Sequence, residues 1–248
     1  MIELIHVSKR FGEAQVLKDV SLSVAKGEML ALIGRSGEGK SVLLKHIAGL
    51  LRPDSGSVVL DGQHLEKLSG RGLRALRSRI GFVFQGGALF DSMTVQENVA
   101  CPLQEKTHLP EADIRAKVFE GLAQVGLTGA ENKHPSELSG GMVKRTALAR
   151  VLVTNPEIVL FDEPTTGLDP IISNAILDLI QACHQRFHFT GVIISHQMSD
   201  VFRIAQRVAM LHGGRIRLHG TPAEFQNTED AVVRQFITGS RSGPLTWI

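Results

Sequence analysis

The sequence predicts an α/β fold with a mainly parallel β-sheet. Three short apolar runs, Met29–Ile33, Ile158–Phe161 and Gly191–Ser195, are typical of strands that are buried on both faces. Segments with helical spacing of apolar residues alternate with these runs, and Ser41–Leu51 and Ile171–Phe187 are the clearest of them. Strands that alternate with helices indicate a parallel sheet covered by helices.

Two parts of the chain depart from this alternation. Residues 1–33 carry strand patterns with a turn at Phe11-Gly12, and we expect an N-terminal antiparallel β-subdomain there. Residues 94–153 carry mostly helical signals, and strand signals resume after them, which indicates an inserted helical subdomain. Further strands are expected at Ser57–Leu60 and Ile80–Phe84, and a terminal hairpin at Val208–Leu211 and Arg215–Leu218. We expect one domain over residues 1–248, with a core at about 1–93 and 154–226, a helical subdomain at about 94–153 and a C-terminal tail at about 227–248.

Composition excludes several classes of protein. Of the 248 residues, 43% are hydrophobic and 21% are charged, which excludes a disordered chain. No apolar run approaches the roughly 18 residues needed to span a bilayer. The N-terminal residues lack a signal-peptide pattern, and Cys101 and Cys183 form no disulfide or zinc pattern, so we expect a cytoplasmic protein. A net charge of +2 is too small to predict binding to nucleic acid.

A glycine-rich loop connects the first buried strand to the helix that follows it. The segment Gly34-x-x-x-x-Gly39-Lys40-Ser41 matches the phosphate-loop pattern. Its glycines allow successive backbone N–H groups to turn toward a phosphate, and the following helix N-terminus favours the same anion. Lys40 adds a positive charge for the β- and γ-phosphates, and the Ser41 hydroxyl is a ligand for Mg²⁺. The loop predicts a nucleotide-binding, P-loop NTPase (RecA-like) core.

Two acidic residues end the second buried strand. Asp162 is placed to bind the metal, and Glu163, which points elsewhere because side chains alternate along a strand, is the candidate general base. The alternative is that these residues only end the strand in a polar turn. A second glycine loop, Leu138–Gly141, precedes a predicted helix, with Ser139 as the N-cap and N–H groups available for another anion.

In this order, the motifs resemble those of the ATP-binding subunits of ABC transporters over nearly the whole chain. The resemblance identifies the Walker A loop with Gly34–Ser41, the Q-loop glutamine with Gln85, the signature with Leu138–Gly141, Walker B with Ile158–Asp162, the D-loop with Gly167–Asp169 and the switch histidine with His196. Phe11 matches the adenine-stacking aromatic, although tyrosine is more usual there. Gln197 follows His196 where aspartate is frequent, so the hydrogen bonds around His196 are left open.

The resemblance implies an ATPase with ATP and Mg²⁺ as its cofactors. It implies that Glu163 and His196 are catalytic and that Ser41, Gln85 and Asp162 bind the metal. It also implies that two subunits pair head to tail, so that each ATP lies between one Walker A loop and the signature of the other chain. The residues expected to contact ATP are Phe11, Gly34, Arg35, Ser36, Gly37, Glu38, Gly39, Lys40, Ser41, Val42, Gln85, Ser139, Gly140, Gly141 and Asp169.

Some segments resemble one branch of the family, the ATPases of Mla-type phospholipid transporters that work with MCE-domain proteins. These segments are Gly39–His46, Phe84–Ser92, Pro164–Ile171 and the signature with Met142, where most ABC importers have glutamine. The branch implies a peripheral protein on the cytoplasmic face of the inner membrane, with a separate integral membrane permease and an MCE-domain lipid-binding protein as partners. The alternatives are an ATPase of an importer for a small solute, such as an amino acid, and a non-transport ABC ATPase that acts on ribosomes or DNA.

Overall fold

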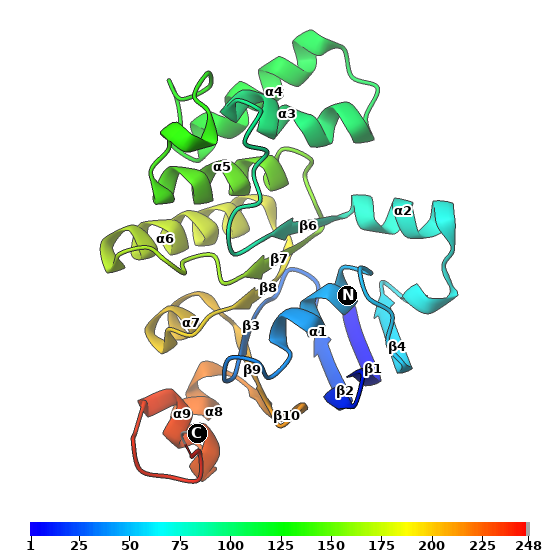
Figure 1. Ribbon diagram of the computed structural model, residues 1–248, viewed down its shortest axis with the longest axis vertical. Helices are drawn as coiled ribbons and strands as arrows, with labels where there is room; N and C mark the ends of the chain where they lie inside the picture. Colours follow the sequence, from blue (N-terminus) through cyan, green and yellow to red (C-terminus); the bar gives the residue numbers. More distant parts are fainter. Residues whose placement is uncertain (247–248) are drawn as a thin grey trace. The chain divides into compact units, whose positions relative to one another are not determined.

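A computed structural model describes residues 1–246, and these residues divide into two units (Figure 1). Unit 1 comprises Met1–Arg74 together with the chain from Thr190 to its C-terminus, and unit 2 comprises Ala75–Phe189. Helix α2 (Gly70–Ser78) contains the boundary between them. Each unit is therefore described by itself.

An antiparallel sheet forms the N-terminal part of unit 1. Its strands are β1 (Ile2–Phe11), β2 (Ala14–Val24), β4 (Ser55–Leu60) and β5 (Gln63–His64), in the order β2-β1-β4-β5. The predicted turn at Phe11-Gly12 is confirmed, and Gly12 has a φ of +58° there. The predicted antiparallel β-subdomain is thus present, with β5 and the short helix η1 (Leu65–Lys67) as additions that the sequence pattern did not predict.

The second group of strands in unit 1 is mainly parallel. Strand β3 (Met29–Ile33) pairs in parallel with both β8 (Thr190–Ile194) and β9 (Arg207–His212), and every residue of β3 and β8 is buried. Strand β10 (Arg215–Gly220) completes the predicted hairpin with β9. These strands confirm that the short apolar runs are buried parallel strands.

The helices of unit 1 follow local signals. Helix α1 (Lys40–Ile47) is shorter than the predicted Ser41–Leu51, because Gly49 adopts a φ of +65° and ends the helical backbone. The remaining helices of the unit are α7 (Met198–Ile204), α8 (Pro222–Gln226) and α9 (Ala231–Thr238). Helix α9 lies in the segment that we expected to be a C-terminal tail.

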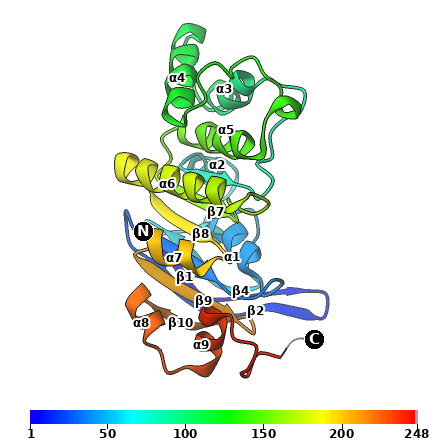
Figure 2. The same ribbon diagram turned by 90° about the vertical axis from the view of Figure 1, so that its left-hand side faces the viewer.

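Unit 2 combines two parallel strands with helices. Strand β6 (Ile80–Val83) pairs with β7 (Ile158–Asp162), and a Cβ atom at Gly81 would lie 2.2 Å from Val151, so β6 and α5 approach closely. Helices α3, α4 and α5 pack on one another in the inserted region (Figures 1 and 2). The helices of unit 2 are α3 (Val95–Lys106), α4 (Glu111–Gln124), η2 (Pro135–Glu137), α5 (Gly140–Leu152) and α6 (Pro170–Phe187).

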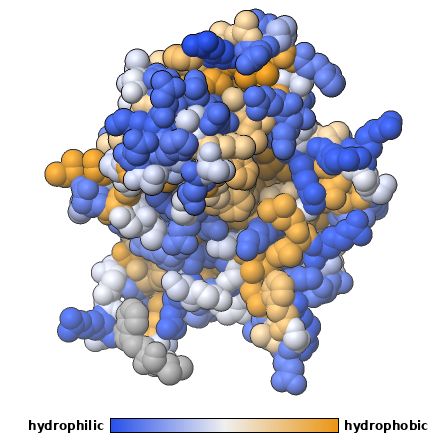
Figure 3. All heavy atoms as spheres, turned by 45° about the horizontal axis from the view of Figure 1, so that its top comes forward, coloured by the Kyte–Doolittle hydropathy of each residue, from blue (hydrophilic) through white to orange (hydrophobic). Residues whose placement is uncertain are grey.

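The predicted fold class is confirmed. The chain has an α/β P-loop architecture with mainly parallel strands, an N-terminal antiparallel sheet and an inserted helical region. Within residues 1–246, no helix combines the length and apolar character that crossing a bilayer requires. The face drawn in Figure 3 mixes hydrophilic side chains with patches of apolar ones. The most exposed large apolar side chain among the described residues is that of Ile171, at 79%.

Candidate active site

The loop between β3 and α1 has a backbone that only glycine adopts without strain. Gly34 has a φ of +146°, and a Cβ atom there would lie 2.3 Å from the carbonyl oxygen of Leu211. Gly39, the N-cap of α1, has a φ of +99°, and its Cβ atom would lie 2.7 Å from Val16. Gly37 also has a positive φ, of +81°. These glycines leave the inside of the loop open to an anion.

Lys40 is folded back across this loop. Its ammonium donates hydrogen bonds to the carbonyl oxygens of Gly34 and Arg35, both at 2.8 Å, and the residue is only 4% exposed. The positive charge is therefore held among the backbone groups of the loop, next to Ser41 in the first turn of α1. The role of Lys40 in holding the β- and γ-phosphates stays a prediction.

Glu38 has contacts that the sequence pattern did not predict. Its carboxylate lies 2.9 Å from the His212 ring and accepts a hydrogen bond from the backbone N–H of Gly213 at 3.1 Å. The side chain therefore ties the loop to the end of β9. Phe11, expected to stack on adenine, is 47% exposed, and the ammonium of Lys9 lies 5.7 Å from its ring centroid.

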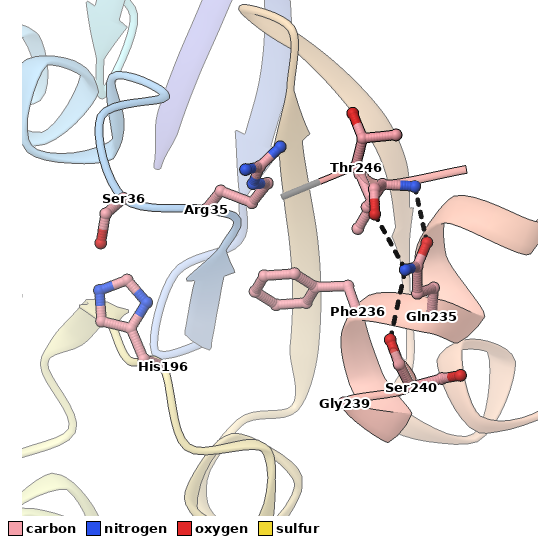
Figure 4. A pocket seen from close by; sticks show the side chains of 9 residues that line it. Arg35, Ser36, His196, Gln235, Phe236, Gly239, Ser240 and Thr246 are labelled. Carbon is pink, nitrogen blue, oxygen red and sulfur yellow. Dashed lines mark hydrogen bonds between the residues drawn. The ribbon is translucent and has the colours of Figure 1, made fainter. Parts of the chain in front are cut away.

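His196 follows β8, and its side chain is exposed. With Arg35 and Ser36 it lines a cavity of about 380 Å³ within unit 1. Figure 4 shows the imidazole beside Ser36 and the ring of Phe236 pointing toward Arg35 and His196. Gln197, the next residue, donates its backbone N–H to the Ser195 hydroxyl at 3.2 Å. The C-terminal residues of this cavity were missed, because their short helix carries no motif.

In unit 2, the structure brings Gln85 and Glu163 together. The Gln85 side-chain amide donates to the Glu163 carboxylate at 3.1 Å, and the Thr166 hydroxyl donates to it at 3.0 Å. Glu163 has a φ of +50°, a region that costs energy for a residue with a side chain and is enriched at functional sites. Asp162 ends strand β7 immediately before it. The two acidic residues thus leave the strand in different conformations.

Lys144 supports this group of residues and was also missed by sequence reasoning. Its ammonium donates to the backbone carbonyl of Gln85, and the residue is 7% exposed. Burial lowers the pKa of the Lys144 ammonium, and the nearby Glu163 carboxylate partly opposes that shift. The contact joins α5 to the segment that carries Gln85.

The predicted signature loop has the expected helix cap. Ser139 is the N-cap of α5 and accepts a hydrogen bond from the backbone N–H of Met142 at 3.3 Å. A Cβ atom at Gly140 would lie 3.1 Å from Leu168, and one at Gly141 would lie 2.8 Å from Ile172. The glycines thus let the start of α5 pack closely on the start of α6.

Asp169 also has a structural role at the start of α6. Its carboxylate caps this helix by accepting the backbone N–H groups of Ile171 and Ile172, both at 3.0 Å. Ser139, Gly141 and Ile172 line one cavity of about 340 Å³ within unit 2. The signature and the D-loop region are therefore neighbours in this unit.

The expected site residues are divided between the units. Unit 1 carries Phe11, the loop from Gly34 to Val42, and His196, whereas unit 2 carries Gln85, Ser139–Gly141, Asp162, Glu163 and Asp169. No group of three or more His, Cys, Asp or Glu side chains is arranged to hold a metal ion in the part of the chain that the structure describes. The expected metal ligands are instead a hydroxyl, an amide and a carboxylate, which all offer the oxygen atoms that Mg²⁺ prefers.

Known proteins share this sequence and fold. A family model described as ABC transporter matches residues 17–166. The chain is 40% identical to the "Intermembrane phospholipid transport system ATP-binding protein MlaF" of Haemophilus influenzae, over 99% of this chain and 93% of the relative. It is 41% identical to the "Probable ribonucleotide transport ATP-binding protein mkl" of Mycobacterium tuberculosis, over 98% of this chain and 68% of that one.

A plant protein and a solved structure are also similar to this chain. The "Protein TRIGALACTOSYLDIACYLGLYCEROL 3, chloroplastic" of Arabidopsis thaliana is 43% identical over 100% of this chain and 76% of its own length. The ATP-binding cassette MJ0796, solved as a dimer in a post-hydrolysis state with ADP and Pi, superposes with a TM-score of 0.82 at 32% identity, over 90% of this chain and 99% of that one. The chain therefore belongs to the ABC transporter family, as an ATP-binding subunit that hydrolyses ATP.

Proposed function

We propose that this chain is the ATPase subunit of a phospholipid transporter of the Mla type. The observation that carries the proposal is its 40% identity to the MlaF protein over 99% of the chain. We place the protein on the cytoplasmic face of the inner membrane as a homodimer. A separate membrane permease and an MCE-domain lipid-binding protein complete the complex.

ATP binding follows from the loop geometry. The N–H groups of the loop and the Lys40 ammonium surround the β- and γ-phosphates, and Phe11 stacks on the adenine. Ser41, Gln85 and Asp162 would hold Mg²⁺, which would supply positive charge against the phosphates. Gln85 also donates its side-chain amide N–H to Glu163 at 3.1 Å.

Hydrolysis needs a base and a group that positions the γ-phosphate. Glu163 accepts the proton of the attacking water, while the hydrogen bonds from Gln85 and Thr166 orient its carboxylate. His196, exposed beside Ser36, donates a hydrogen bond to the γ-phosphate. Ser139 and the N–H groups at the start of α5 bind the γ-phosphate that the partner subunit holds with its own Lys40.

The head-to-tail arrangement predicts a disulfide between two chains. The test protein carries Cys101→Ser and Cys183→Ser, Glu163→Gln to block turnover, and new cysteines at Ser36 and Ser139. A disulfide requires Cα atoms within roughly 7 Å of each other. We expect a covalent dimer that forms strongly with Mg-ATP and only faintly with ADP, because ATP stabilises the interface by mass action. A link within one chain, or one that is indifferent to nucleotide, contradicts the arrangement.

Two experiments test the transported substrate: purification of the complex and deletion of the gene. We expect the complex purified from detergent-solubilised membranes to contain an MCE-domain protein and bound phospholipid. We also expect deletion of the gene in a Gram-negative host to leave excess phospholipid in the outer leaflet of the outer membrane. A periplasmic solute receptor in the complex, or loss of growth on one nutrient with normal envelope lipids, supports a solute importer instead. The name of the mycobacterial relative makes ribonucleotide uptake the first solute to measure.

A further inference from the structure

The cavity beside the phosphate loop is partly built by the C-terminal segment of unit 1. On one side lie Arg35, Ser36 and His196, and on the other lie Phe236 from α9 and Leu245 from the segment after it. The Phe236 ring points toward Arg35 and His196 (Figure 4). The C-terminal side of the cavity therefore contributes two apolar side chains, beside the polar residues Gln235, Ser240 and Thr246.

One buried side chain holds this C-terminal wall in place. The Gln235 amide is 5% exposed and donates to the carbonyl oxygens of Ser240 at 3.2 Å and Leu245 at 3.1 Å. Its oxygen accepts the backbone N–H of Leu245 at 2.7 Å. Asp230 caps the start of α9 and accepts a hydrogen bond from Arg217 of β10 at 2.7 Å. These bonds hold the C-terminal wall on α9 and tie α9 to β10.

Unit 2 exposes an apolar side chain next to its signature loop. Ile171 is 79% exposed in the first turn of α6. Asp169 caps this helix and Pro170 begins it, so the Ile171 side chain has no role in the cap. Its neighbour Ile172 packs against Gly141 of the signature. Ile171 therefore lies close to the signature loop, and any partner that contacts the loop also comes near Ile171. An isoleucine with this exposure gains free energy when a partner covers it.

We propose that the cavity of about 380 Å³ is a socket for Ile171 of the partner subunit. The inference rests on the proposed head-to-tail homodimer, in which Ser139 of one chain faces the phosphate loop of the other. Ile171 then arrives beside Ser36, where Phe236 and Leu245 offer an apolar surface. The occupant is a second copy of this chain, because the socket continues the phosphate-loop surface that faces that copy in the proposed dimer. A two-fold symmetric dimer has two such sockets.

The socket gives the C-terminal segment a function in ATP-driven dimerisation. The segment contacts no phosphate in this arrangement, yet it buries an apolar side chain only when the two nucleotide sites close. Closure of the dimer and burial of Ile171 against the C-terminal wall are thus coupled.

Cross-linking tests the socket separately from the dimer. In the background with Cys101→Ser, Cys183→Ser and Glu163→Gln, one variant adds Ile171→Cys and Ser240→Cys, where Ser240 lines the cavity. The matched control adds Ile171→Cys and Thr238→Cys, because Thr238 is exposed on α9 but does not line this cavity. With Mg-ATP and a short bismaleimide, we expect a covalent dimer from the first variant and little from the control. The Ser36–Ser139 cysteine pair reports the dimer itself.

The outcomes are distinct. A Ser36–Ser139 link without an Ile171–Ser240 link overturns the socket and leaves the proposed function standing. Absence of both links overturns both. Equal linking at Thr238 and Ser240 also overturns the socket, because the contact would then be non-specific.

Dimer affinity provides a second measurement that needs no new cysteine. In the Glu163→Gln background with Mg-ATP, Ile171→Ala should raise the dimer dissociation constant about 100-fold, or tenfold for each of the two sockets. Ile5→Ala, which truncates an exposed isoleucine of β1, is the control and should change it little. Adding Phe236→Ala to Ile171→Ala should cost less than the sum of the two single effects, because the two side chains share one contact. Strict additivity by analytical ultracentrifugation would overturn the socket.

Discussion

Replacement of Glu163 by glutamine is expected to slow ATP hydrolysis about 1,000-fold and to leave ATP binding intact. A general base contributes a factor of about 10²–10⁴ to a reaction, and an amide cannot accept the proton of the attacking water. Glutamine has nearly the same shape, and its amide oxygen can still accept the hydrogen bonds that Gln85 and Thr166 donate to the carboxylate at 3.1 and 3.0 Å. The loss should therefore appear in the chemical step alone.

Phosphate release from the assembled transporter measures this loss, and calorimetry with ATP measures binding. The control is Glu120→Gln, which removes an exposed carboxylate of α4 in the same unit. Parental turnover in the Glu163→Gln protein would contradict its assignment as the base. If ATP affinity fell together with turnover, the Glu163 carboxylate would be needed for nucleotide binding rather than for activating water.

The second large effect concerns binding. Replacement of Lys40 by alanine is expected to weaken ATP binding about 100-fold. A hydrogen bond to a charged group is worth about 1.5–3 kcal/mol, and we propose that the ammonium faces both the β- and the γ-phosphate. The same change removes the donor for the carbonyl oxygens of Gly34 and Arg35, both 2.8 Å from the ammonium. The loop thus loses its internal support as well as its charge.

Titration of each protein with ATP gives the affinity, and thermal unfolding shows whether the fold persists. Lys45→Ala is the matched control, because Lys45 is an exposed lysine of the same helix. An unchanged ATP affinity in the Lys40→Ala protein, with the control also unchanged, would remove Lys40 from the phosphate site.

Features that depend on sequence neighbours were predicted correctly. The run Met29–Ile33 is a buried strand, and Ser139 caps α5 as expected. Both follow from hydrophobic periodicity and cap chemistry, which act over a few residues. The end of α1 was placed too late, because the effect of Gly49 was not weighed against the apolar spacing that continues to Leu51.

Features that depend on distant parts of the chain were not predictable. The bond from Lys144 to the carbonyl of Gln85 joins residues from different elements, and no local pattern specifies it. The same holds for Glu38, whose partners His212 and Gly213 come from the far end of the sequence. The wall of the socket is a further case, because a glutamine in a short helix carries no recognisable signal. Such contacts arise only when the fold has brought the elements together.

The pairing of β3 has a consequence for how the protein is made. Met29 of β3 pairs with Gly191 of β8, and Leu30 pairs with Arg207 of β9, so both neighbours of β3 are synthesised long after it. Strand β1 instead pairs with β2 and β4, which all lie within the first 60 residues. Contacts between distant residues form slowly, and an unpaired apolar strand is prone to aggregation until they do. The strand that presents the phosphate loop must therefore remain protected on the ribosome until the last third of the chain emerges.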